Sequence, residues 1–171
     1  MILEEIREGV VYVNGTSYFG ATETVKLPEI QFRTNERKPT GGIGSLELPG
    51  GLDKLEMEIG WKSYDRRLAR SLFNPRVATS LQIRSVKRVF DGAGGVSSEV
   101  AVVTHITVLP KSFGLGEHKG GEAIDVPTKF AVHAIKQIVG NETLVDIDVI
   151  NQIFAIGGED LLSNLRNILG I

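Results

Sequence analysis

The fold is decided by residues 81–109, LQIRSVKRVFDGAGGVSSEVAVVTHITVL. Two runs rich in β-branched residues, 81–90 and 99–109, flank the segment DGAGGVSS, in which Asp91-Gly92 and the following glycines favour a hairpin connection. Residues 128–139 and 142–148 repeat this arrangement around Gly140-Asn141. These patterns predict locally paired antiparallel strands. They argue against Rossmann and TIM arrangements, in which strands alternate with helices.

The first third of the chain adds further strands. Residues 10–14 are β-rich and end in Asn14-Gly15, a dipeptide typical of a tight hairpin turn. Residues 25–32 are interrupted by Pro28, which lacks an amide donor, so this strand is expected at an edge or with a bend. Residues 55–61 alternate apolar and polar side chains with a period of two. This alternation predicts a strand with one buried and one solvated face.

Two short helices are expected. Ser63 is predicted to cap a helix that ends before Asn74-Pro75 and buries a face made of Tyr64, Leu68, Leu72 and Phe73. The segment EDLLSNLRNILG, residues 159–170, predicts a terminal amphipathic helix with Glu159 and Asp160 in its first turn, where the helix dipole favours acids. The chain is therefore predicted to form one mainly β domain over residues 1–171, an antiparallel β-sandwich or barrel with a central short helix, an arm-like loop and a C-terminal helix.

Residues 35–51, NERKPTGGIGSLELPGG, are predicted to form an extended arm and not a core element. Loops of this length are uncommon inside compact domains unless they act as lids, binding loops or arms. Ile43, Leu46 and Leu48 are apolar side chains that a merely solvated loop does not require. We therefore expect another surface to cover them.

Composition excludes several classes of protein. The chain has 171 residues, 19 basic and 21 acidic side chains, a net charge of -2 and no cysteine. The absence of cysteine removes disulfides, thiolate zinc sites, iron–sulfur clusters and a cysteine nucleophile. The charge balance argues against a dedicated duplex-DNA binder. No apolar run approaches the roughly 20 residues of a membrane helix, and the start, MILEEIREG, is unlike a signal peptide, so we expect an unexported protein without a membrane anchor.

Charge is segregated along the chain. Residues 62–90 carry eight basic side chains against Asp65 alone, whereas residues 140–171 carry five acids against Arg166 alone. Two interpretations stay open at this point. The charges either pair within one monomer or form complementary faces between identical subunits.

The sequence shows no catalytic or metal-binding constellation. His105, His118 and His133 have no neighbour at the spacing of a metal pair, and the two within strand patterns read as ordinary sheet histidines. The glycine-rich segments GGIG, GAGG and GLGEHKGG lack the strand-to-helix context of a phosphate-binding loop. No Gly-x-Ser-x-Gly elbow occurs. We therefore predict no enzyme, no cofactor and no metal.

Four segments carry a resemblance to a known family. Residues 13–30, VNGTSYFGATETVKLPEI, join an Asn-Gly turn, an aromatic residue, a glycine and a Leu-Pro strand, and residues 38–61 lead from a Gly-rich arm into an alternating strand. Residues 116–122, GEHKGGE, form a polar loop, and residues 144–171, LVDIDVINQIFAIGGEDLLSNLRNILGI, place a Val-x-Ile-Asp-x-x-Asn strand before a short terminal helix. With these segments the chain resembles the major tail tube proteins of contractile-tailed bacteriophages, the P2-like family that includes R-type pyocin tubes.

The resemblance implies a β-sandwich whose inner sheet joins those of five other subunits, so that hexameric rings with a β-lined channel stack into a tube. It also implies a virion protein, assembled in the host cytoplasm, that conducts DNA during ejection into the host. Its partners would be further copies of itself, the tail sheath protein, and the tape-measure and baseplate or initiator proteins, with only transient passage of DNA. Such a tube is structural and performs no chemistry.

Three sets of residues are candidates for these contacts. The arm would contact a neighbouring subunit or ring through Arg37, Lys38, Ile43, Leu46 and Leu48. A channel that does not hold phosphates favours acidic or neutral side chains, and Glu56 and Glu58 are the candidates on the wet face of their strand. Glu159 and Asp160 are candidates for the surface that faces the sheath.

Two alternatives remain open. The first is the tube of a genome-free contractile injection particle, such as an R-type pyocin or a secretion system, which would use the same subunit. The second is a monomeric β-sandwich in which the arm covers a small ligand. A hydrolase would require activity that is lost on changing His105 or His133.

Overall fold

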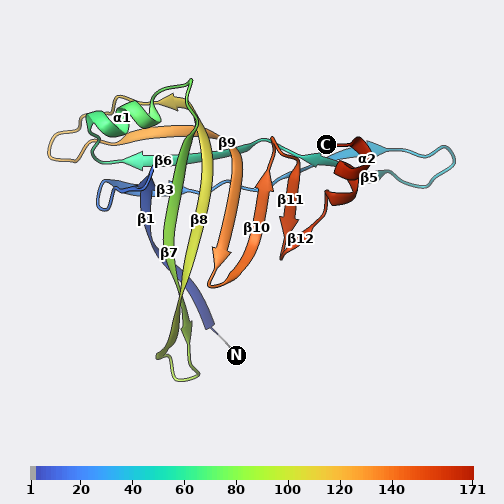
Figure 1. Ribbon diagram of the computed structural model, residues 1–171, viewed down its shortest axis with the longest axis horizontal. Helices are drawn as coiled ribbons and strands as arrows, with labels where there is room; N and C mark the ends of the chain where they lie inside the picture. The colour runs from blue at the N-terminus through green and yellow to red at the C-terminus, as the bar shows by residue number, and fades with distance from the viewer. Residues whose placement is uncertain (1–2) are drawn as a thin grey trace.

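The computed structural model describes residues 3–171, so the first two residues of the predicted domain lie outside the described part. The chain is mainly β with two short helices (Figure 1). Its elements are β1 (Leu3–Val13), β2 (Thr16–Ser17), β3 (Thr22–Lys26), β4 (Phe32–Arg37), β5 (Leu46–Leu52), β6 (Leu55–Trp61), α1 (Arg66–Leu72), β7 (Thr79–Phe90), β8 (Val96–Phe113), β9 (Val126–Val139), β10 (Glu142–Asp148), β11 (Ile153–Ile156), β12 (Glu159–Asp160) and α2 (Ser163–Leu169).

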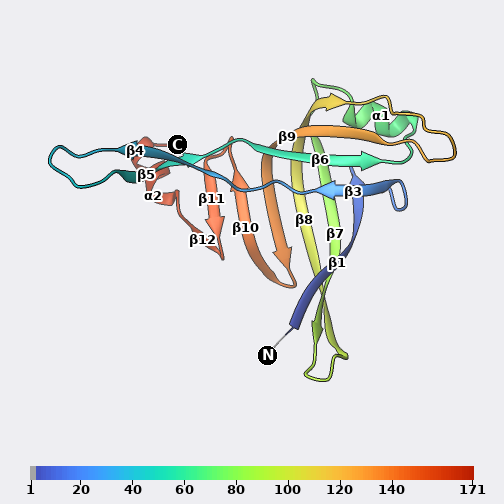
Figure 2. The ribbon, with the colours of Figure 1, turned by 180° about the vertical axis from the view of Figure 1, so that it is seen from behind.

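One continuous antiparallel sheet builds both layers of the body. Its main path runs β12-β11-β10-β9-β8-β7-β1-β2, while β6 pairs with β9 and carries β3 on its other edge. The strands β6 and β3 cross behind β7 and β8 in Figure 1 and in front of them in Figure 2. The predicted sandwich is therefore folded from a single sheet.

Strand β9 joins the two layers because it changes partner along its length. Its residues 126–132 pair with β6, and its residues 134–139 pair with β10. His133 lies between these two stretches, at a register shift against β8 where Thr107 pairs with Ala134 and Val108 with Val132. The backbone carbonyl of His133 accepts a hydrogen bond from the Val149 amide at 2.9 Å. A bulge bends the strand that carries it, and here the bend directs β9 into both layers.

The core lies between the layers and is closed by α1. The four alternating residues of β6, Leu55, Met57, Ile59 and Trp61, are all buried, as the period of two predicts. They meet apolar side chains of β7, β8 and β9 and two leucines of α1, namely Leu81, Ile83, Ile106, Val108, Phe130, Val132, Leu68 and Leu72. The ring of Tyr18 contacts Trp61 edge to face at a centroid distance of 5.9 Å.

The structure confirms the predicted hairpins. Val13 pairs with Thr16 across Asn14 and Gly15, both with positive φ, and the pairs β7–β8 and β9–β10 are antiparallel neighbours. The predicted strand over residues 25–32 is not continuous, because β3 ends at Lys26, before Pro28, and the next strand begins at Phe32; β3 itself lies at a sheet edge as expected. These connections depend on local turn chemistry, which a sequence displays directly.

Three predictions about local structure were wrong. The arm is a β-hairpin of β4 and β5 and not an irregular loop. The cap of α1 is Asp65 and not Ser63, because extended Asp65 immediately precedes the helix and its Oδ1 accepts from the Leu68 amide at 2.7 Å. Glu159 and Asp160 form β12 and not a helical turn, because Gly157 and Gly158 have φ of 59° and 87° and turn the chain into a hairpin.

Candidate functional surfaces

The arm projects from the body as a two-stranded hairpin (Figures 1 and 2). Every residue of β4 is exposed, and Ile43 at the tip is fully exposed. Arg37 lies opposite Leu46, and Asn35 lies opposite Leu48. Because side chains alternate along a strand, these four share one face of the arm. The structure therefore brings most of the predicted arm contacts together on one exposed surface.

The other face of the arm carries a pair of glutamates that the sequence analysis did not single out. Glu36 of β4 lies directly opposite Glu47 of β5, and both are exposed. Neither forms an ion pair with any residue of the described chain. Like charges directly opposite each other destabilise a strand pair. The arm is thus amphipathic, with leucines on one face and carboxylates on the other.

At the root of the arm an ion pair joins its two ends, and an aromatic contact joins the root to the body. Arg33 donates from Nε and Nη2 to Oδ1 of Asp53 at 3.1 and 2.9 Å, and the Lys54 amide donates to the same oxygen at 2.8 Å. These hydrogen bonds, from the Lys54 amide first and from Arg33 second, lower the pKa of the Asp53 carboxyl. Phe32 contacts Phe154 edge to face, and together they border an apolar groove of about 450 Å³ between the arm root, β11 and α2.

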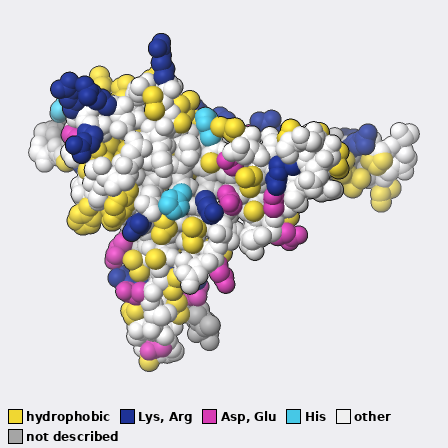
Figure 3. All heavy atoms as spheres, viewed as in Figure 1, with side chains coloured by type: hydrophobic (Ala, Val, Ile, Leu, Met, Phe, Trp, Pro, Cys, Tyr) yellow, Lys and Arg dark blue, Asp and Glu magenta, His cyan; other side chains and the backbone are white. Residues whose placement is uncertain are grey.

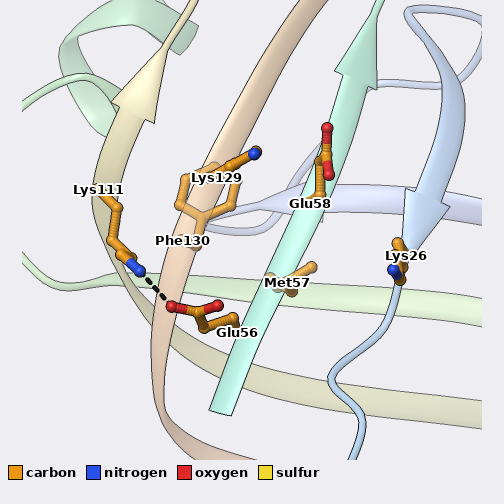
Figure 4. A pocket seen from close by; sticks show the side chains of 7 residues that line it. All are labelled: Lys26, Glu56, Met57, Glu58, Lys111, Lys129 and Phe130. Atoms are coloured by element: carbon orange, nitrogen blue, oxygen red, sulfur yellow. Dashed lines mark hydrogen bonds and ion pairs between the residues drawn. The ribbon is translucent and has the colours of Figure 1, made fainter. Parts of the chain in front are cut away.

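The predicted channel residues Glu56 and Glu58 lie on the outer face of β6, opposite the face that packs into the core. Three lysines from neighbouring strands, Lys26, Lys111 and Lys129, border the same shallow pocket (Figure 4). Glu56 forms ion pairs with Lys111 and, at 3.1 Å, with Lys54. These contacts, that with Lys111 foremost, lower the pKa of Glu56. The patch around the two glutamates therefore carries more positive than negative side chains.

The two residues predicted to face the sheath differ in their surroundings. Glu159 is exposed, whereas Asp160 is half-buried and bonded to Arg166 of α2. The hydrogen bond from Arg166 is the main reason why the pKa of Asp160 is lowered. The exposed surface near them is apolar and comprises Leu161, Leu165, Ile168, Leu169 and Ile171.

The basic stretch divides into a paired and an unpaired part. Lys87 pairs with Glu4 at 2.6 Å, and Arg88 pairs with Glu8 and Glu99. These partners lie in β1 and β8 and not in the acidic C-terminal segment. By contrast, the exposed guanidinium groups of α1 have no carboxylate within 4 Å in the described chain, and they border a groove of about 480 Å³. Figure 3 shows lysine and arginine gathered at the α1 end of the molecule.

Within residues 3–171 no group of three histidine, cysteine or acidic side chains is placed to hold a metal ion. The described helices are also too short and insufficiently apolar for any of them to cross a membrane. The features that stand out are therefore an exposed amphipathic arm, open strand edges and charged surfaces, which are features of protein–protein contact.

Comparison with known proteins gives these surfaces a context. The model of the family described as phage tail tube protein FII matches residues 4–170. The chain belongs to this family. Tail tube proteins of this kind are structural components of contractile phage-like injection systems, so the predicted resemblance is confirmed over nearly the whole chain.

A relative with the same role supports the assignment to the tail tube family. The chain is 26% identical over 166 residues to the tail tube protein of Escherichia phage P2, with 94% of each chain covered. The family model, which matches residues 4–170, spans both the arm and the C-terminal hairpin and helix.

Solved structures confirm the tail tube fold. One chain of the sheath–tube complex of an extracellular contractile injection system superposes with a TM-score of 0.54 and 12% identity, over 76% of this chain and 87% of that one. A chain of the tube-terminating cap of the anti-feeding prophage gives a TM-score of 0.56 and 11% identity, over 77% and 88%. The mainly β architecture is thus shared with proteins of such particles at low sequence identity.

Proposed function

We propose that this tail tube protein forms hexameric rings that stack into the inner tube of a contractile tail. The observation that carries the proposal is the exposed arm with its uncovered leucines. Leu46 and Leu48 are 57% and 42% exposed on a hairpin that reaches the core of its own subunit at its root, where Leu52 packs against the core cluster. A second copy that covers Ile43, Leu46 and Leu48 would remove this apolar surface from water.

Open strand edges support the same proposal. In the described chain β1 pairs with β2 only through Tyr12 and Val13, so residues 3–10 have no strand on the side away from β7. Long unpaired edges are a template for pairing with another chain, and a ring removes them by symmetry. The opposite end of the same sheet path is the two-residue strand β12. Pairing between these ends of adjacent copies would extend one sheet around the ring.

The proposed partners follow from the tube role. One relative in fold comes from a sheath–tube complex, and we infer that a sheath protein encloses this tube as well. Glu159 and the apolar residues of α2 are the proposed contact. Tape-measure and baseplate proteins would set the length and start of assembly in the host cytoplasm. DNA would pass through the finished virion tube, and the chain itself would catalyse no reaction.

The charge of the channel wall depends on which strand lines the channel. Glu56 and Glu58 stay candidates for this wall. The lysines around them would give that wall a positive excess, which would retard DNA and would suit a particle that carries no genome better. A density map of the assembled tube and its contents would place β6 and would separate a phage tail from a pyocin-like particle.

Electron microscopy of the purified chain, together with its mass in solution, tests the proposal. Six-fold rings or hollow tubes are expected, either spontaneously or after addition of an initiating baseplate complex. Replacing residues 36–47 by a short Gly-Ser linker should abolish the assemblies and leave the circular dichroism of the body intact. A wild-type chain that stays monomeric at high concentration with the initiator present would contradict the proposal and favour a monomeric binding module.

A further inference from the structure

Three arginines on α1 form no ion pair in the described chain, although the sequence has more acidic than basic side chains. Arg66, Arg67 and Arg70 border one groove together with Ser71, and all three guanidinium groups are exposed. None lies within 4 Å of a carboxylate in residues 3–171. Lys62, which precedes α1, behaves differently, since it pairs with Glu23 at 2.6 Å.

Two of these arginines, Arg66 and Arg67, work against the stability of their own helix, whereas Arg70 lies in its last turn. Arg66 and Arg67 occupy the first turn of α1, which contains no acidic residue. The helix dipole disfavours positive charge in that turn. Asp65 offsets this only through its cap to the Leu68 amide. A local conflict of this kind is typical of residues that serve a contact beyond the subunit.

One face of the arm presents the complementary charge, while Arg37 lies on the other face with the leucines. Glu36 and Glu47 face each other across β4 and β5, and their carboxylates repel one another in the isolated subunit. Arginine side chains approaching from outside would relieve that repulsion and would form charge-assisted hydrogen bonds. The arm face thus carries unpaired carboxylates, and the groove on α1 carries unpaired guanidinium groups, in the described chain.

The two surfaces cannot meet within one subunit. The arm and α1 lie at opposite ends of the longest axis of the molecule (Figure 1). A contact between different copies is then head to tail, and every copy offers one arm and one arginine groove. Such heterologous contacts either close into a ring or continue from one layer to the next.

We propose that the Glu36–Glu47 face of the arm of one copy docks in the Arg66–Arg67–Arg70 groove of a second copy of this chain. This inference rests on the proposed tube function and specifies the surface that receives the arm. It leaves the leucine face of the arm free to be covered by other parts of the assembly.

Charge reversal and charge exchange test the contact in the full chain. The variant Glu36→Arg/Glu47→Arg and the variant Arg66→Glu/Arg70→Glu should each reduce the yield of rings or tubes at least tenfold. Combining the four substitutions should restore assembly to within about threefold of wild type, because the attraction is only exchanged. The matched control is Glu29→Arg/Glu142→Arg, which alters two exposed glutamates without ion pairs in the described chain.

Cysteine cross-linking measures the contact without altering its charges. The chain has no cysteine of its own. Thr34 shares the carboxylate face of the arm, and Ser71 borders the arginine groove. A Thr34→Cys/Ser71→Cys variant should give a ladder of disulfide-linked multimers, whereas Asn35→Cys/Ser71→Cys, on the leucine face, should not. A ladder that stops at six would place the contact within a ring, and a longer ladder would place it between rings.

The outcomes separate this inference from the proposed function. If both charge-reversal variants form tubes as the wild type does, and no cross-linked ladder appears, the docking contact is overturned and the tube function still stands. A wild-type chain that never assembles would overturn the tube function itself. The contact is supported if each charge reversal lowers the yield of rings or tubes, the combined charge exchange restores it, and the cysteine variant gives a ladder of disulfide-linked multimers.

Discussion

Arg166 donates a hydrogen bond from Nη2 to Oδ2 of Asp160, and this bond joins helix α2 to strand β12. The same guanidinium donates from Nη1 to the backbone carbonyl of Gln152 at 2.8 Å. A helix of seven residues is too short to be stable alone in water, so its position depends on contacts of this kind. Arg166 therefore links α2 both to β12 and to the turn before β11.

The variant Arg166→Met is expected to release α2 while the body stays folded. Backbone amides of α2 should then exchange with solvent markedly faster than in the wild type, measured by hydrogen exchange. The pKa of Asp160 is lowered in the folded state, so its contribution to stability is present above the ordinary value of 3.8 and is lost as pH falls through the lower folded-state pKa. Acidification should thus release α2 in the wild type too. Arg76→Met, at a site without an ion pair in the described chain, should change neither result.

Removing the cap of α1 should destabilise the body. Asp65→Ala is expected to lower the free energy of unfolding by about 1 kcal/mol, since the Leu68 amide loses its acceptor. Urea denaturation followed by circular dichroism measures this change. Ser63→Ala is the control and should have little effect. Equal losses in the two variants would show that Ser63 takes part in capping.

Trp61 offers a test of an unpaired buried donor. Its side chain is fully buried, and Nε1 has no hydrogen-bond partner in the described structure. Trp61→Phe removes an unsatisfied donor that costs about 1–3 kcal/mol, which offsets the packing that is lost. We expect near-neutral stability for Trp61→Phe and a loss of about 3–5 kcal/mol for Trp61→Ala. A large loss for the phenylalanine variant would indicate a partner for Nε1.

Gly60 lets strand β3 approach β6 closely. A Cβ atom at this position would lie 2.5 Å from Oγ1 of Thr24, so Gly60→Ala requires the Thr24 side chain to rotate or β3 to move. The expected cost is about 1–3 kcal/mol of unfolding free energy, measured by denaturation, with faster amide exchange in β3. Gly92→Ala is the matched control, because no atom lies within 4 Å of its added methyl group.

The sequence predicted those parts of the fold that depend on neighbouring residues. Asn14-Gly15, Asp91-Gly92 and Gly140-Asn141 each mark a hairpin that the structure contains. The alternation over residues 55–61 identified a strand and its buried face correctly. Periodicity and turn chemistry are local properties, and no knowledge of distant partners is needed to interpret them.

Features that depend on distant pairing were not predictable in the same way. No local pattern in residues 126–139 predicts that the strand changes its pairing partner from β6 to β10 at His133. Pro39, Pro49 and the glycines of the arm are poor strand formers and favour a loop, yet β4 and β5 pair across them. The opposition of Glu36 and Glu47 also depends on that register. Residue type alone therefore identifies candidate contact residues of the arm. The register of β4 and β5 is needed to divide the arm into a leucine face and a carboxylate face.

The bend of β9 at His133 has a mechanical consequence. Since one covalent strand runs through both layers, the layers cannot slide past each other unless hydrogen bonds to β6 or β10 break along several residues at once. A force applied to one layer is transmitted to the other through the peptide backbone and not only through apolar side-chain packing between the layers. Each subunit of this tail tube protein should therefore resist shear as one rigid unit and not as two separate layers.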